Sequence, residues 1–220
     1  MNNGLLKGCL AVTMLIVAGA ANADNKFGLG VKAGTLGLGV EGTWRPLPYL
    51  DFRLGANTFD YDETGTQAGI EYDANLALDT VHATANLHFP VSPFRLTVGA
   101  VSNGNELELV SADDDAIIVI GGVAYPANLV GTVSGLTSFS STSPYAGVGF
   151  DFTVFGKLGL NLDFGVLWQG DPEVTLAASG PLGSDPVFQE ALEAERQELI
   201  EEVEDFKAWP VVSLGFVYNF

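Results

Sequence analysis

The chain has little that could support thiol chemistry or binding to a polyanion. It contains one cysteine, Cys9, and nine lysine and arginine residues against 27 acidic ones. Cys9 lies inside a segment that we expect to be removed, so the mature chain would have no disulfide, reactive thiolate or cysteine-ligated metal. The formal net charge of −18 argues against nucleic acid or anionic lipid as a partner, because both are polyanions.

Long hydrophobic runs are also missing, except at the start. Residues 1–23 have the pattern of a secretory signal peptide, with Lys7 at the positive end, an apolar stretch, and the small-x-small sequence Ala21, Asn22 and Ala23 before the cleavage site. That stretch is short for a membrane-spanning helix, and no later one is long and apolar enough. Residues 24–220 then form one domain. Hydrophobic residues make up 47% of the chain, so an exported, apolar chain of this kind indicates a β-barrel.

The last ten residues, 211–220, carry the strongest fold signal. Apolar residues alternate strictly with small or polar ones, which predicts a strand with one apolar face. The apolar positions are Val212, Leu214, Phe216, Tyr218 and Phe220. A strand that closes an outer-membrane barrel ends in this way, and its aromatic terminus resembles the signal that such barrels present to their insertion machinery. We therefore expect Phe220 to be read by that machinery.

Seven earlier segments alternate in the same way, which predicts an all-β fold, an eight-stranded antiparallel transmembrane β-barrel. The eight expected strands are 27–33, 36–45, 50–59, 70–89, 94–103, 144–155, 158–169 and 211–220. Short periplasmic turns are expected at 46–49, 90–93 and 156–157. Long extracellular connections are expected at 60–69, 104–142 and 170–209, with 34–35 as a short exception. Short and long ends alternate as such barrels require.

Three local features refine this prediction. In the fourth strand the apolar positions change from even to odd numbers between Leu78 and Val81, which predicts a β-bulge near Asp79 and Thr80. The long connection 104–142 is expected to be a hairpin on the outer rim. Residues 186–207 have helical spacing after a capping Asp185, which predicts one amphipathic helix in the last loop. Trp168 and Trp209 are expected in the outer aromatic girdle.

The alternation also places polar residues inside the barrel. Charged residues are absent from the outward positions of the clear strands, as lipid requires. The inward candidates are Lys32, Glu41, Arg45, Asp51, Arg53, His82, His88, Arg95, Asp151, Asn161 and Asp163. Two interpretations stay open: a polar conduit with walls of both signs, and an interior filled by ion pairs, which an eight-stranded barrel is narrow enough to require. Inward glycines favour the conduit by removing bulk, although strong curvature of the strands explains them equally well.

The excess of acidic residues falls in the long connections. A rim of this sign would attract cationic solutes and repel anions, although a merely solvated surface explains it equally well. The residues concerned are Asp113, Asp114, Asp115, Glu190, Glu193, Glu198 and Glu201. The three consecutive aspartates lack the spacing of a calcium loop, so we expect no metal and no cofactor.

Several of these segments resemble CarO-type outer-membrane proteins. The resemblance lies in the excursion from Asn103 to Tyr125, in 143–150 and 170–176, in the acidic helix, and in the ending that begins at Trp209. It implies an eight-stranded barrel that is proposed to admit small amino acids, notably basic ones such as ornithine, and that is linked to carbapenem uptake. No residue motif for transport is carried over from that family.

Three functions follow as hypotheses. The first is a narrow channel or uptake barrel for small polar or cationic solutes, in the Gram-negative outer membrane and in contact with its lipid and lipopolysaccharide. The second is a non-conducting structural or interaction barrel, in which the 186–207 helix caps the lumen or binds a partner. The third, a lipid-modifying enzyme, is disfavoured because His82 and His88 have no serine near them in the sequence.

Overall fold

The computed structural model describes residues 26–67, 70–111 and 117–220. The expected signal peptide and the aspartates Asp113, Asp114 and Asp115 lie outside these ranges. No helix in the described residues is long and apolar enough to cross a membrane.

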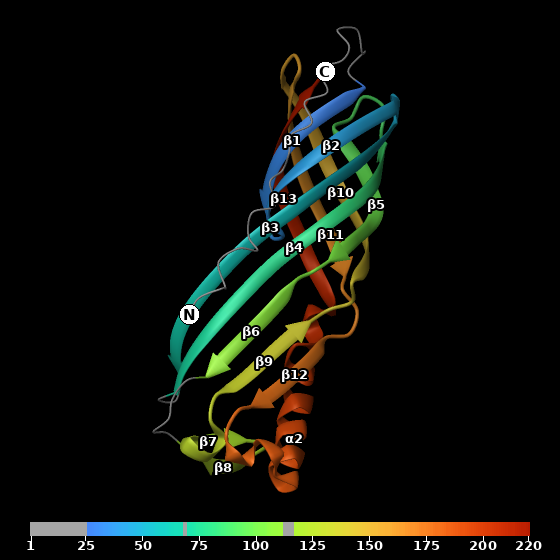
Figure 1. Cartoon of the computed structure of the whole chain (residues 1–220). Coiled ribbons are helices and arrows are strands. Elements are labelled where there is room, and N and C mark those ends of the chain that lie inside the picture. Colours follow the sequence, from blue (N-terminus) through green and yellow to red (C-terminus); the bar gives the residue numbers. More distant parts are fainter. Residues whose placement is uncertain (1–25, 68–69, 112–116) are drawn as a thin grey trace.

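Eight antiparallel strands close into a barrel, as the sequence predicts. They are β1 (Phe27–Gly34), β2 (Gly37–Leu47), β3 (Leu50–Gln67), β4 (Ile70–His88), β5 (Phe94–Asn103), β10 (Thr142–Phe155), β11 (Leu158–Trp168) and β13 (Ala208–Asn219). Each strand pairs with the next in this order, and β13 returns to β1 to close the cylinder. Figure 1 shows this barrel with the C-terminus at its upper end.

The alternation of side chains explains why the sheet closes with a lipid-compatible outside. In β13, Val211, Ser213 and Val217 are buried, whereas Leu214 and Phe216 are exposed on the outer wall. The same parity runs through β3 and β5, where Asp51, Arg53 and Arg95 are buried. A belt of outward apolar side chains around a polar interior is the arrangement of a barrel that stands in a bilayer.

Five of the eight strands continue beyond the barrel on one side. β3 and β4 are simply longer, while β6 (Glu106–Ser111), β9 (Val133–Ser138) and β12 (Glu173–Ala178) prolong the lines of β5, β10 and β11 after short breaks. We call this open sheet, in the order β3-β4-β6-β9-β12, the extension. Figure 1 shows it running away from the barrel at the end opposite the C-terminus.

The extension corrects two predictions. Residues 60–67 are not a loop, because they continue β3 and pair with β4 as far as Gln67 opposite Ile70. Polar cross-strand pairs hold this part together: Thr64 Oγ1 donates to Asp73 Oδ1 at 2.7 Å, and Asn75 Nδ2 donates to Asp62 Oδ1 at 2.5 Å. Residues 173–178 were expected within a loop and instead form β12, the outer edge of the extension.

The bulge predicted near Asp79 and Thr80 is also wrong. The pairing of β3 with β4 runs without a register shift from Leu50 to Gln67, and Leu78 is buried on the same face as Thr80 and His82. What changes there is the environment of the two faces. Inside the membrane belt the apolar side chains point outward to lipid, whereas in the extension they point to the inner face.

The long connection 104–142 is more than a rim hairpin. β6 and β9 join the extension, and between them stand the two-stranded hairpin β7 (Ile117–Ile120) with β8 (Val123–Pro126) and the short helix α1 (Ala127–Val130). This hairpin forms a second apolar core with the late helix. The buried members of that core are Ile118, Ile120, Ala127, Val130, Phe188, Ala191 and Leu192.

The predicted helix begins where the capping pattern placed it and ends earlier than predicted. The 3-10 turn η1 (Pro181–Ser184) leads into α2, which spans Pro186–Glu202 and is followed by the 3-10 turn η2 (Glu204–Lys207). The Asp185 carboxylate accepts hydrogen bonds from the backbone N–H groups of Val187 and Phe188. Because Phe188 and Leu192 pack against the β7–β8 core, that part of the apolar stripe neither caps the lumen nor faces a partner.

Candidate functional site: the barrel lumen

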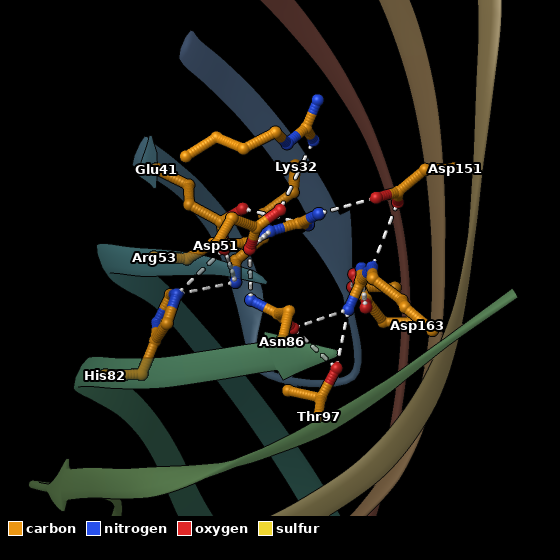
Figure 2. Close-up of polar contacts among 12 residues, drawn as sticks. Lys32, Glu41, Asp51, Arg53, His82, Asn86, Thr97, Asp151 and Asp163 are labelled. Carbon is orange, nitrogen blue, oxygen red and sulfur yellow. Dashed lines mark hydrogen bonds and ion pairs between the residues drawn. The ribbon is translucent and has the colours of Figure 1, made fainter. Parts of the chain in front are cut away.

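An ion-pair network fills the middle of the barrel. The network draws at least one side chain from each of the strands β1, β2, β3, β4, β5, β10 and β11, because within the membrane belt the charged residues of these strands have the inward parity (Figure 2). The members of this network are Lys32, Glu41, Arg45, Asp51, Arg53, His82, His88, Arg95, Asp151 and Asp163. All ten were predicted as inward-facing from the sequence.

Arg53 stands at the centre of one half of the network. Its guanidinium donates to Glu41 Oε1 at 3.3 Å, to Asp51 Oδ1 at 3.3 Å and to Asp151 Oδ2 at 2.8 Å. The side chain is 4% exposed and Asp51 is fully buried. Asp51 also accepts from Asn86 Nδ2 at 2.7 Å and lies 2.6 Å from His88 Nε2. Together with Arg45, whose Nη2 lies 3.3 Å from Asp51 Oδ2, four groups compensate this buried carboxylate.

Arg95 links the other half of the network. It donates to Asp151 Oδ1 at 3.0 Å, to Asn86 Oδ1 at 2.9 Å and to Thr97 Oγ1 at 2.6 Å, and it pairs with Asp163. Only 1% of this side chain is exposed. Since Asp151 also accepts from Arg53, a continuous chain of charges crosses the lumen (Figure 2).

The two histidines belong to this network. His82 Nε2 lies 3.0 Å from Glu41 Oε2 and 2.9 Å from Lys32 Nζ, while His88 contacts Asp51 and Asp151. Asp51, His88 and Asp151 bring three potential metal ligands within 4.8 Å of one another. However, Arg45, Arg53 and Arg95 already bond these same carboxylates, and three guanidinium groups would repel a metal ion.

Inward glycines make room for the network rather than for a solute. A Cβ atom on Gly149 would lie 2.5 Å from Arg95 Cζ, and one on Gly55 would lie 2.5 Å from the His82 ring. Gly165 faces Tyr145 in the same way, at 2.5 Å from its hydroxyl oxygen. The prediction that these glycines open a conduit is therefore wrong at these three positions, because a neighbouring side chain occupies each space.

Gly149→Ala tests this close packing. The new methyl group must displace the Arg95 guanidinium, so we expect the free energy of unfolding to fall by about 1–3 kcal/mol. Gly42→Ala is the matched control, since its Cβ would point outward with its nearest neighbour at 3.8 Å. Urea-dependent folding into lipid vesicles measures both, and equal effects would contradict the assignment.

An apolar cluster, which we call the apolar ring, lies inside the barrel beyond the network, at the end from which the extension rises. Its buried members and the partly buried aromatics packed against them are Leu36, Val101, Leu167, Val211, Tyr145 and Trp209. Trp209 was expected in the outer girdle, but it lies in this ring and contacts Phe206 in a tilted arrangement at a centroid distance of 6.0 Å. The sequence reading missed the ring, although the parity that places Arg95 inside also places Val101 there.

A small cavity lies between the apolar ring and the network. Its volume is about 40 Å³, room for a few water molecules at most. Its lining includes Leu36, Val101, Tyr145 and Val211 from the ring, and Lys32, Glu41, Arg53, His82, Arg95 and Asp163 from the network. Asn161, the remaining predicted residue, is buried and lines a smaller space of about 10 Å³ beside Lys32 and Asp163.

Hydrogen bonds of the Gln169 side chain, which we call the polar clasp, link the last loop to the end of the barrel next to the apolar ring. The Gln169 side chain accepts from Asn103 Nδ2 at 2.9 Å and from Asn105 Nδ2 at 3.3 Å, and it donates to the backbone oxygen of Phe206 at 3.1 Å. Through Phe206 this clasp reaches Trp209 of the ring. Movement of the η2 segment would thus act on the ring directly.

The part of the predicted acidic rim that belongs to α2 is exposed on the surface of that helix. Glu190, Glu193, Glu198 and Glu201 are exposed on α2. Hydrogen bonds from Arg196, at 2.8 and 2.6 Å, lower the pKa of Glu193 to about 2. The other three carboxylates lie on the solvent-facing side, away from the lumen network.

Comparison with known proteins supports the architecture. No family model matches the chain, and no curated protein matches it. Two solved structures share the fold: Acinetobacter baumannii CarO and CarO2, each with 23% sequence identity over 88% of this chain and a TM-score of 0.59. The alignments cover 97% and 98% of those chains. Neisserial surface protein A aligns with 13% identity over 88% of this chain and 93% of its own, at a TM-score of 0.31 that supports no further comparison. The resemblance to CarO seen in the sequence is thus confirmed for the fold.

Proposed function

We propose that this protein is an outer-membrane barrel that takes up small zwitterionic or cationic solutes, with amino acids as the substrate class, through a lumen that is closed at rest. One observation carries the proposal. The cavity between the ring and the network presents cationic groups (Lys32, Arg53, Arg95) and carboxylates (Glu41, Asp163) beside apolar side chains. An amino acid offers the complementary ammonium, carboxylate and side chain.

The network also favours a zwitterion over other small solutes. Breaking one buried ion pair leaves two uncompensated charges, which costs several kcal/mol. A zwitterion supplies a partner for each of the two, whereas a neutral solute supplies neither. The acidic residues outside the barrel add to this preference, because their field attracts cations to the mouth.

The proposal includes a cellular location, the outer membrane, and the export route that leads there. The pattern of residues 1–23 supports export through a cleaved signal peptide. The apolar outer belt of the barrel supports insertion into the Gram-negative outer membrane, in contact with its lipid and lipopolysaccharide. We further propose that the insertion machinery reads the aromatic terminus at Phe220.

A second candidate function is a non-conducting barrel that displays the extension and α2 at the cell surface. The observation in its favour is the packing of the lumen, where Arg53 and Arg95 are buried and bonded on all sides. Such a barrel would use the network only as its core. The two candidates differ in one property, the passage of solutes.

Liposome swelling separates the candidates. We expect vesicles that contain the purified protein to swell in ornithine and glycine, and to swell more slowly in glutamate, because the acidic mouth repels a net anion. Vesicles prepared without protein are the control, and arabinose, a neutral solute of similar size, tests the preference for charge. Vesicles that stay silent in all four solutes would contradict the uptake proposal and favour the surface barrel.

A further inference from the structure

The extension leaves one strand edge open. β2 pairs with β3 only as far as Leu38 opposite Thr58, because the β1–β2 hairpin turns at Thr35 and Leu36. β3 then continues to Gln67, and among the described residues its sole strand partner in this part is β4. Residues 60–67 therefore present a free edge outside the barrel, visible in Figure 1 as the long end of β3.

Alternation of the ladder shows which backbone groups this edge presents. Arg45 N donates to Lys26 O at 2.7 Å, so odd residues of β2 bond to β1 and even ones to β3. His88 N donates to Tyr49 O at 2.8 Å, which likewise assigns the odd residues of β3 to β4. The even residues of β3 direct their N–H and C=O groups toward the side that β2 no longer occupies. At the free edge these residues are Asp60, Asp62, Thr64 and Thr66.

The two faces of this edge differ in chemistry. The outer face carries the exposed carboxylates of Asp60 and Asp62. The inner face carries Phe59 and Tyr61, which are 42% and 49% exposed, and their rings stack at 6.5 Å. Glu63 also lies on the inner face, where it accepts from the Tyr61 hydroxyl at 3.1 Å. A strand added here would thus meet acidic groups on the outer face, and aromatic rings beside one carboxylate on the inner face.

We propose that the free edge of β3 binds an extended cationic peptide by strand addition, with basic side chains beside Asp60 and Asp62 and apolar ones beside Phe59 and Tyr61. Backbone hydrogen bonds supply the affinity in this mode, and alternate side chains supply the specificity. The proposal concerns the outer surface and is independent of whether the lumen admits solutes.

The acidic charge around this edge favours a cationic peptide over a second copy of the chain. Segments 60–79, 104–142 and 170–207 together contain 22 acidic residues and two basic ones. Charged residues on an edge strand prevent pairing with another copy of the same edge, since like charges would face each other. The same charges attract a strand of opposite sign and raise its association rate.

A blocked peptide of alternating lysine and valine is the probe. We expect saturable binding to the full chain in detergent micelles, followed by fluorescence anisotropy, that weakens as salt is raised. Carbonyl-labelled peptide should show the infrared band of an antiparallel sheet. Methylation of the peptide nitrogens that face β3 should weaken binding at least about tenfold, because each methyl group removes one backbone hydrogen bond to the edge.

A pair of matched variants locates the site. Asp60→Asn with Asp62→Asn should weaken binding about fivefold, while Asp62→Asn keeps the oxygen that accepts from Asn75. Glu106→Gln with Glu108→Gln removes the same charge from the outer face of β6, on the far side of β4, and should change binding less than about twofold. Equal effects of the two pairs, or undiminished binding of the methylated peptide, would show attraction to the acidic surface in general and would overturn the proposal.

Discussion

Replacing Arg95 with methionine should lower the free energy of unfolding by about 3–5 kcal/mol, the typical cost of removing one partner from a buried ion pair. Methionine fills much of the same space, so lost packing contributes little. The change leaves the carboxylates of Asp151 and Asp163 without the guanidinium that bridges them. Urea-dependent folding into lipid vesicles, followed by tryptophan fluorescence, measures the difference.

Two comparisons make this result specific. Arg45→Met removes a guanidinium that is 33% exposed and whose partner Asp51 keeps three other groups, so we expect a loss of about 1 kcal/mol or less. Adding Asp163→Asn to Arg95→Met removes one of the unpaired charges and should recover part of the loss. If Arg45→Met and Arg95→Met destabilised the barrel equally, burial would not be the cause.

Opening the lumen should require changes at both of its closed layers. The apolar ring and the ion-pair network lie in series along one path, and the resistances of barriers in series add. We therefore expect Leu167→Ala in the ring or Arg53→Ala in the network to raise ion conductance by no more than about twofold each. The combined variant should raise it by more than about tenfold, with a preference for cations that reflects the carboxylates left behind.

Planar bilayer recordings of the four proteins test this expectation. Leu54→Ala is the control, because Leu54 points outward from the barrel wall and its truncation does not touch the lumen. If either single change raised the conductance as much as the combined variant is expected to, the other layer would not be a barrier to ions. A combined variant that folds but stays silent would contradict the uptake proposal and leave the surface barrel as the function.

Coupling between the surface and the lumen follows from the clasp. The Gln169 side chain donates a hydrogen bond to the Phe206 backbone oxygen, and the Phe206 side chain contacts Trp209 of the ring. An event that moves η2 would shift Trp209 as well. The ring is thus the layer that contacts η2, whereas side chains from seven strands hold the network.

The candidate site could be predicted residue by residue but not as an assembly. Strict alternation places Arg53 and Arg95 inside, since a charged side chain facing lipid is costly. It does not say that Gly149 and Gly55 supply the space for Arg95 and His82, because that depends on which residues the register sets opposite each other. Whether inward glycines open or fill a lumen is therefore a question of register.

The apolar ring could also be predicted from the alternation of inward and outward residues. Val101 and Leu167 have the inward parity of Arg95 and Asp163, yet an apolar residue inside a polar lumen breaks the expected pattern and is easily overlooked. The predicted bulge failed for a related reason. The change at Leu78 reflects the end of the membrane belt, where the preferred face for apolar residues reverses, and period alone does not distinguish this from an extra residue in the strand.

The sequence by itself determined the closed barrel, its strand order and its polar interior, because period-two alternation is a local property that lipid on the outside enforces at every strand. The tertiary structure decided the rest. It showed that long strands prolong the wall into an extension with a free edge, that α2 packs on a hairpin, and that the charges close into one network. Each of these depends on contacts between segments far apart in the chain, which are set by the register and packing that local alternation leaves undetermined.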